Sequence, residues 1–160
     1  MKETMTSGAQ MRRLQDTLIV AGAGVVAFSL WSMAKTAMFL ALTDDAQLLE
    51  LFGLDIPTVN ILYITAGVIV VIDLAIRTYV GLSARAEGRG KRKSPVYLIV
   101  AAICAVLNAY SAIAIVLGSS VTVSVLDAVI SIAIEATSLL ALILVIYCSV
   151  RLRALRKASG

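Results

Sequence analysis

Five charged side chains lie inside long apolar stretches of this sequence, and these residues are the best placed to carry out chemistry. A charge at the depth of a lipid bilayer is costly, so such residues are usually paired with one another or functional. The chain contains no His, the most common metal ligand and general base. The available chemistry is therefore that of carboxylates and amines that exchange partners or protons. The five residues are Lys35, Asp73, Arg77, Asp127 and Glu135.

Asp73 and Arg77 are four residues apart, which places them on one face of a helix, where they can form an ion pair. Arg77 is also close enough to the end of its apolar segment for its long side chain to reach the interface. Two interpretations stay open. The pair anchors the inner end of the helix, or Asp73 forms part of a binding or proton site.

Lys35 has two candidate partners, and the choice depends on where the last apolar segment becomes helical. If the helix begins at Val121, Asp127 lies at the depth of Lys35. If Ser124 is the N-cap, Asp127 lies in the first turn near the outer surface, and Glu135, about 15 Å deep, faces Lys35. The β-branched residues that precede Ser124 are a weak helix start and favour the second arrangement.

Polar side chains share helix faces with these charges and predict a polar interior between the helices. We predict an intramembrane ion or ligand site formed by Lys35, Asn108, Ser131 and Glu135. The alternative is that the same groups only hold the helices together through hydrogen bonds. The sequence predicts no catalytic residue, metal ligand or cofactor.

The composition is that of a polytopic membrane protein. Hydrophobic residues make up 60% of the 160-residue chain and charged residues 15%, against about 45–50% and 25% in soluble domains. The mean hydropathy is +0.96. Cys104 and Cys148 both lie in apolar runs and are expected to be packing residues. No CxxC pair indicates a zinc or redox centre.

Four apolar segments are long enough to cross a bilayer, which takes about 20 helical residues. We predict an all-α fold with spans at about 17–42, 57–80, 95–117 and 121–150, arranged as two antiparallel hairpins. Residues 1–16 form a polar segment without a recognisable fold, and 151–160 form a basic tail. Residues 81–95 are expected to be a solvated loop that ends in the N-cap Ser94 and in Pro95 at the first helical position.

Basic residues gather at both termini and in the loop 81–95, whereas the loop 43–57 is acidic. The positive-inside rule therefore predicts cytoplasmic N- and C-termini in the cell membrane. The basic clusters lack the interleaved aromatic residues of a nucleic-acid groove, so no nucleic-acid partner is expected. Contact with anionic lipids is predicted for one cluster, which comprises Arg89, Lys91, Arg92 and Lys93.

These features favour a small transporter or channel module in which Glu135 carries a proton or cation and Lys35 is its counter-charge. Four helices enclose little volume, so a homo-oligomer is expected to form the pathway. The alternative is a non-catalytic scaffold, assembly or lipid-binding subunit of a membrane complex, which the small residues of Ala21–Gly24 would suit. An intramembrane enzyme ranks last, because no nucleophile is visibly paired with a base.

Overall fold

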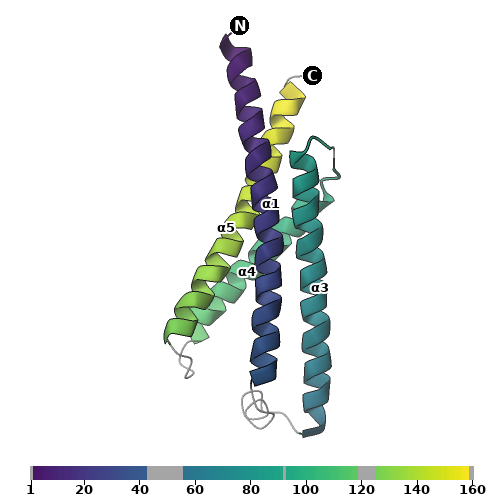
Figure 1. Ribbon diagram of the computed structural model, residues 1–160, viewed down its shortest axis with the longest axis vertical. Coiled ribbons are helices and arrows are strands. Elements are labelled where there is room, and N and C mark those ends of the chain that lie inside the picture. Colours follow the sequence, from purple (N-terminus) through teal and green to yellow (C-terminus); the bar gives the residue numbers. More distant parts are fainter. Residues whose placement is uncertain (1, 43–55, 92, 119–124, 159–160) are drawn as a thin grey trace.

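The protein is all-helical throughout the described residues 2–42, 56–91, 93–118 and 125–158 of a computed structural model. The helices are α1 (Lys2–Leu42), α3 (Ile56–Gly88), α4 (Val96–Gly118) and α5 (Val125–Ala158). Each of these four helices contains a stretch long and apolar enough to span a membrane. Both chain ends lie at the same end of the molecule (Figure 1). Most of the predicted loop 43–57, the turn around 119–120 and Arg92 fall outside the described residues.

The helices extend well beyond the predicted spans, and the expectation of a loop over 81–95 was wrong for its first half. The segment 1–16 is helical from Lys2, the expected loop 81–95 is helical as far as Gly88, and the expected tail is helical to Ala158. At about 1.5 Å per residue, the 41 residues of α1 reach about 60 Å, roughly twice the hydrocarbon thickness of a bilayer. Packing beyond the apolar stretches explains the extra length, because Leu152 is fully buried there.

α3 ends in a hydrogen-bonded cap built around Gly90. The Lys91 N–H donates to the Ala86 carbonyl at 3.1 Å and the Gly90 N–H to the Glu87 carbonyl at 3.0 Å, the two bonds of a Schellman motif. Gly90 has a φ of 89°, a conformation that glycine adopts without steric cost. The helix therefore stops at a defined place, directly after the buried residues Glu87 and Gly88.

α4 begins as the sequence predicted. The Ser94 hydroxyl accepts a hydrogen bond from the Val96 N–H at 3.4 Å, and Pro95 occupies the first position after this cap. The N–H of Leu98 donates to the Pro95 carbonyl at 2.9 Å. Because a hydroxyl cap fixes the start of a helix, it also fixes where the side chain of Tyr97 enters the bundle.

α1 and α3 approach so closely that only glycine fits at their crossing. A Cβ atom on Gly81 would lie 2.5 Å from the carbonyl oxygen of Gly22, and one on Gly22 would lie 2.7 Å from that of Gly81. One helical heptad later, a Cβ on Gly88 would lie 2.9 Å from the Gln15 carbonyl. In lipid, such close backbone packing takes over much of the role of the hydrophobic effect. Of the predicted small-residue surface, Gly22 is buried here, whereas Ala23 is exposed.

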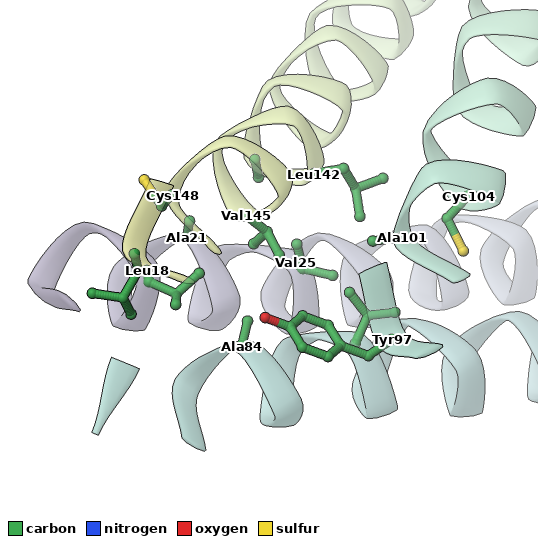
Figure 2. Packing of buried hydrophobic residues seen from close by; sticks show 13 residues of the cluster. Leu18, Ala21, Val25, Ala84, Tyr97, Ala101, Cys104, Leu142, Val145 and Cys148 are labelled. Carbon is green, nitrogen blue, oxygen red and sulfur yellow. The ribbon is translucent and has the colours of Figure 1, made fainter. Parts of the chain in front are cut away.

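The core consists of buried residues from all four helices, most of them three or four positions apart along each helix, and Figure 2 shows part of this cluster. This spacing keeps the buried residues on one side of each helix, as in coiled-coil packing. Cys104 and Cys148 are buried, free and part of this core, as predicted. The buried apolar residues are Leu18, Ala21, Val25, Val80, Ala84, Tyr97, Ala101, Cys104, Ala141, Leu142, Val145, Cys148 and Leu152.

The surface opposite these buried residues is strongly apolar. The exposed fractions of four large apolar side chains are 71% for Val20, 68% for Ile64, 68% for Val106 and 73% for Tyr110. A soluble monomer rarely exposes large contiguous apolar patches. These side chains suit the acyl chains of a bilayer, in agreement with the composition.

Replacing Gly81 by Ala should separate α1 from α3, because the new methyl group has no room beside the Gly22 carbonyl. We expect a loss of about 1–3 kcal/mol in stability, measured as a lower unfolding temperature of the purified protein in detergent. Gly67→Ala on the same helix is the matched control, since nothing lies within 4 Å of its Cβ position. It should leave stability unchanged or raise it by about 0.5–1 kcal/mol. Equal effects of both substitutions would contradict the close crossing.

Candidate functional site

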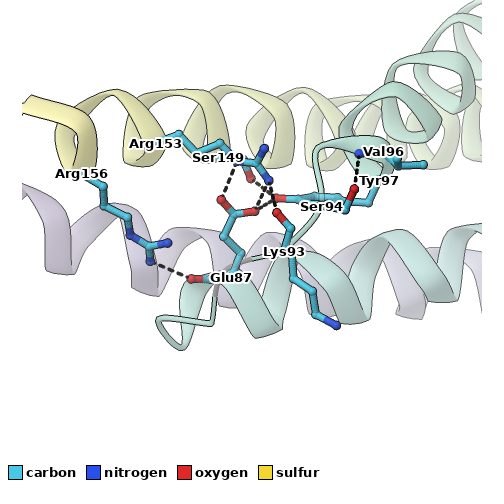
Figure 3. A network of polar contacts seen from close by, with 8 residues as sticks. All are labelled: Glu87, Lys93, Ser94, Val96, Tyr97, Ser149, Arg153 and Arg156. Carbon is cyan, nitrogen blue, oxygen red and sulfur yellow. Dashed lines mark hydrogen bonds and ion pairs between the residues drawn. The ribbon is translucent and has the colours of Figure 1, made fainter.

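A buried ion pair joins α3 to α5 near the chain ends (Figure 3). Arg153 donates from Nε to Oε1 of Glu87 at 2.7 Å and from Nη2 to Oε2 at 2.8 Å. Glu87 is only 1% exposed. A buried carboxylate is tolerated when it is paired and fully hydrogen-bonded, and the planar guanidinium supplies both bonds at once.

Tyr97 brings α4 into the same network. Its hydroxyl donates to Oε2 of Glu87 at 2.5 Å and lies 2.6 Å from the Ser149 hydroxyl. The guanidinium of Arg153 lies 5.7 Å from the centre of the Tyr97 ring, within the range of a cation–π contact. We call Glu87, Tyr97, Ser149 and Arg153 the Glu87 cluster.

Two further bonds hold the chain around the Glu87 cluster. Arg153 Nη2 donates to the carbonyl oxygen of Lys93 at 3.1 Å, and Arg156 Nη2 donates to that of Glu87 at 3.2 Å. The end of α3, the approach to α4 and the last turns of α5 are therefore tied together. This cluster was not predicted from the sequence, because the composition of residues 81–88 indicates a loop. Arg77, Ala84 and Glu87 are seven and three positions apart, which places them on one helix face, and this spacing could have predicted a helix here.

A second cluster surrounds Arg77 further along the helices. The predicted ion pair with Asp73 is present, with Arg77 Nε 2.9 Å from both Oδ1 and Oδ2. Nη2 donates to Oδ1 of Asn108 on α4 at 2.8 Å, and Nη1 to the Ser138 hydroxyl on α5 at 3.1 Å. We call these four residues the Arg77 cluster. The side chain of Arg77 is only 13% exposed, so it points into the bundle rather than towards the interface.

The Arg77 cluster leaves a polar atom without a partner. Asn108 is 2% exposed, and its Nδ2 has no hydrogen-bond partner. The hydroxyl of Ser29 on α1, also 2% exposed, is likewise buried without one. An unmatched buried donor costs free energy, so this level of the bundle is less completely satisfied than the Glu87 cluster.

Lys35 on α1 contacts α5 at the end away from the termini. Its ammonium group donates to the hydroxyl of Ser131. Among the described residues, no ion pair of 4.0 Å or less joins Lys35 to Glu135. The described part of α5 begins at Val125, and residues 119–124 fall outside the described residues, so the N-cap arrangement stays a prediction. Ser124 itself and the side chain of Asp127 fall outside the described residues, so the alternative pairing of Lys35 with Asp127 stays untested.

Glu135 lies between the Lys35 contact and the Arg77 cluster on α5. It is four residues after Ser131 and three before Ser138, which places all three on the stripe that faces the other helices. Its side chain is half-buried, and the charges near enough to affect it are those of Arg77, Lys35 and Asp73. On one side of this acid Lys35 binds the hydroxyl of Ser131, and on the other Arg77 binds Asp73, Asn108 and Ser138.

The predicted four-residue site is therefore divided between two levels. Lys35 and Ser131 are in contact, whereas Asn108 belongs to the Arg77 cluster, and Glu135 lies between them along α5. Within the described ranges, no three His, Cys, Asp or Glu side chains lie close enough to hold a metal ion.

No family model, curated protein or solved structure matches this chain. The function of the chain is therefore inferred from the geometry of these clusters.

Two clefts lined by basic residues lie at the end of the molecule near the termini. One, of about 160 Å³, is lined by Arg85, Arg89 and Lys91 with Leu82 and Ala86. The other, of about 330 Å³, is lined by Glu87, Lys93, Arg153, Arg156 and Lys157. Three of the four residues predicted to contact anionic lipids thus line these clefts, and Arg92 falls outside the described residues.

Replacing Arg153 by Met should strongly destabilise the fold, because it leaves the Glu87 carboxylate buried without its cation. Loss of one partner from a buried pair costs about 3–5 kcal/mol, and the 29% exposure of Arg153 makes this an upper bound. Replacing both residues, as Glu87→Gln with Arg153→Met, should recover much of the loss, since no buried charge remains. Thermal unfolding in detergent measures both, and a double variant less stable than Arg153→Met would contradict this account.

Proposed function

We propose that this small multi-pass membrane protein is an oligomeric transporter or channel module whose intramembrane site is centred on Glu135. One observation carries the proposal. Glu135 is a carboxylate without an ion pair among the described residues, although Lys35 and Arg77 both lie near it. A structural ion pair would bring the charges together, as in the Glu87 cluster. A site that exchanges protons or cations needs its acid available.

Lys35 provides the switch in this mechanism. When Glu135 is ionised, the Lys35 ammonium is attracted towards it and weakens its bond to Ser131. When Glu135 has taken up a proton or a cation, that attraction disappears and Lys35 returns to the Ser131 hydroxyl. Arg77 stays fixed by its bonds to Asp73, Asn108 and Ser138 and supplies a constant positive field.

The pathway itself is proposed to form between copies of the chain. Four helices enclose little volume, and the clusters described above already fill much of the interior near the termini with bonded side chains. A symmetric homo-oligomer would supply the further helices needed to close a pathway beside the half-buried Glu135 of each subunit.

We further propose two antiparallel hairpins with cytoplasmic N- and C-termini in the cell membrane. The support is the placement of basic residues, which gather near both termini and between α3 and α4.

A fluorescent protein fused to the C-terminus should fluoresce in bacterial cells, whereas alkaline phosphatase fused there should be inactive, because it needs the oxidising periplasm. The opposite pattern is expected for insertions between α1 and α3. An active phosphatase at the C-terminus would reverse the proposed orientation.

Glu135→Gln should abolish transport of charge through the site, because the amide cannot exchange a proton. The measurement is proton uptake into vesicles that contain the purified protein and a pH-sensitive dye, driven by a potassium diffusion potential. We expect flux with the native chain and only the protein-free background with Glu135→Gln.

Asp16→Asn, the same chemical change at an exposed position on α1, is the matched control and should retain full flux. Equal elution volumes and unfolding temperatures exclude misfolding as the cause. Native flux in Glu135→Gln, or no flux in the native chain, would contradict a proton-conducting role.

The second candidate is a non-catalytic scaffold, assembly or lipid-binding subunit. The cleft lined by Arg85, Arg89 and Lys91 favours it, because neighbouring cations attract anionic headgroups. The glycine crossing of α1 and α3 also suits a purely structural bundle. Absence of flux combined with retention of anionic lipid through purification would favour this candidate over the first.

A further inference from the structure

Two buried hydrogen-bond donors near Glu135 have no acceptor. Asn108 and Ser29 are each 2% exposed, and neither the Asn108 Nδ2 nor the Ser29 hydroxyl has a hydrogen-bond partner. The orientation of the Asn108 amide follows from its bond to Arg77, because a guanidinium only donates and must therefore meet the amide oxygen. The NH2 group is thus the part of Asn108 that needs an acceptor, and a buried donor without one is costly.

The two donors lie at the same depth of the bundle. α1 and α5 run antiparallel, and the bond of Lys35 to Ser131 fixes their register. Ser29 is six residues before Lys35, so it lies level with the part of α5 about six residues after Ser131. That part is within one helical turn of Ser138. Because Ser138 and Asn108 both accept bonds from the guanidinium of the Arg77 cluster, Ser29 belongs to the level of this cluster.

The charges at this level cancel only while Glu135 is ionised. The ionisable groups that face it or its neighbours are Lys35 on α1, Asp73 and Arg77 on α3, and the buried thiol of Cys104 on α4, which stays uncharged in apolar surroundings. With Glu135 ionised, two positive and two negative charges are present among these residues. With Glu135 protonated, one positive charge is left over, next to donors that need an acceptor. An anion would satisfy both requirements.

We propose that a small monovalent anion binds beside Asn108 and regulates proton exchange at Glu135. The NH2 group of Asn108 and the Ser29 hydroxyl donate to the anion, and Arg77 supplies the neighbouring positive charge. The anion binds better when Glu135 is neutral, so a bound anion in turn favours the protonated acid, because such coupling is reciprocal. This regulation rests on the proposed proton exchange at Glu135 and adds the class of ligand that controls it.

The anion reaches this level from the end away from the termini, because burial decreases in that direction. Asn108 is fully buried, Glu135 and Ser131 are half-buried, and Lys35 is exposed. Towards the termini, buried apolar residues of all four helices fill the interior instead. Lys35 is therefore the first cation on the way in, and Asn108 supplies the innermost donor.

The test measures anion binding to the full-length protein in phosphatidylcholine nanodiscs by isothermal titration calorimetry. Chloride and nitrate are the probes, since neither takes up a proton near neutral pH. Any proton taken up on binding must therefore go to the protein. Binding of both probes indicates a site for any small anion, and binding of nitrate alone indicates a preference for the planar shape that carboxylates share. Either result supports the proposal.

Asn108→Asp keeps an oxygen for Arg77 but replaces the NH2 group by a second carboxylate oxygen. It should weaken anion binding at least about tenfold, because a donor becomes a like charge. Gln10→Glu is the matched control, the same amide-to-carboxylate change at an exposed position on α1, and binding should stay within about twofold. Ser29→Ala removes the other donor without adding a charge and should weaken binding about two- to tenfold.

Glu135→Gln tests the coupling, because the amide stays neutral at every pH. At about pH 8 this variant should bind the anion at least about tenfold more tightly than the native chain. In a weakly buffered sample, the native chain should take up protons as it binds the anion, seen as a rise in pH with an indicator dye. Glu135→Gln should bind without this rise.

Three results would overturn the proposal. These are equal binding by the native chain, Asn108→Asp and Ser29→Ala, no tighter binding by Glu135→Gln, and no binding of either probe by any chain. Unchanged unfolding temperatures of Ser29→Ala and Gln10→Glu keep the comparison valid if Asn108→Asp is unstable. Proton flux is a separate readout, because anion binding with proton uptake but no flux would remove only the transport function, whereas flux without anion binding would remove only the anion site.

Discussion

A charged side chain among apolar helices must find partners there, and this constraint organises the protein. The Glu87 cluster fulfils this requirement most completely, because Arg153 and Tyr97 donate hydrogen bonds to a carboxylate that is almost wholly buried. Through it, α3, α4 and α5 are joined at one end. The close contact between the backbones of Gly22 and Gly81 joins α1 to α3 in a different way, since it involves no charged side chain. Both devices lie in the half of the molecule near the termini, and so do the buried apolar residues.

The charged and polar side chains further from the termini have fewer partners than Glu87 has. In the Arg77 cluster the guanidinium has three partners, but the amide nitrogen of Asn108 has none. Beyond it, Lys35 binds the hydroxyl of Ser131, and Glu135 has no ion pair among the described residues. A bundle that is tight at one end and less satisfied at the other can rearrange locally without losing its fold. The proposed exchange of protons or cations is therefore assigned to Glu135, whereas the bonds of Glu87 suit a structural role.

The sequence predicted the features that depend on local chemistry. Apolar length predicted four helices that can cross a membrane, the four-residue spacing predicted the Asp73–Arg77 pair, and Ser94 predicted the start of α4. It failed where a distant partner decides the outcome. Residues 81–88 have the composition of a loop, yet they are helical because Gly88 packs on α1 and Glu87 meets Arg153, 66 positions away. The bond of Lys35 to Ser131 likewise depends on how α1 and α5 are placed.

The helical extensions beyond the apolar stretches connect the bundle to its basic surface. If α5 ended near Val150, Arg153 and Arg156 would belong to a flexible tail and could neither neutralise Glu87 nor form a wall of the cleft. Because α5 continues to Ala158, both arginines are held at fixed positions beside the end of α3. The same arginine thus satisfies a buried acid on one side and lines a cationic hollow on the other. Any anion bound in that hollow would change the electrostatic environment of the Arg153–Glu87 pair, and so the strength with which α3 and α5 are joined.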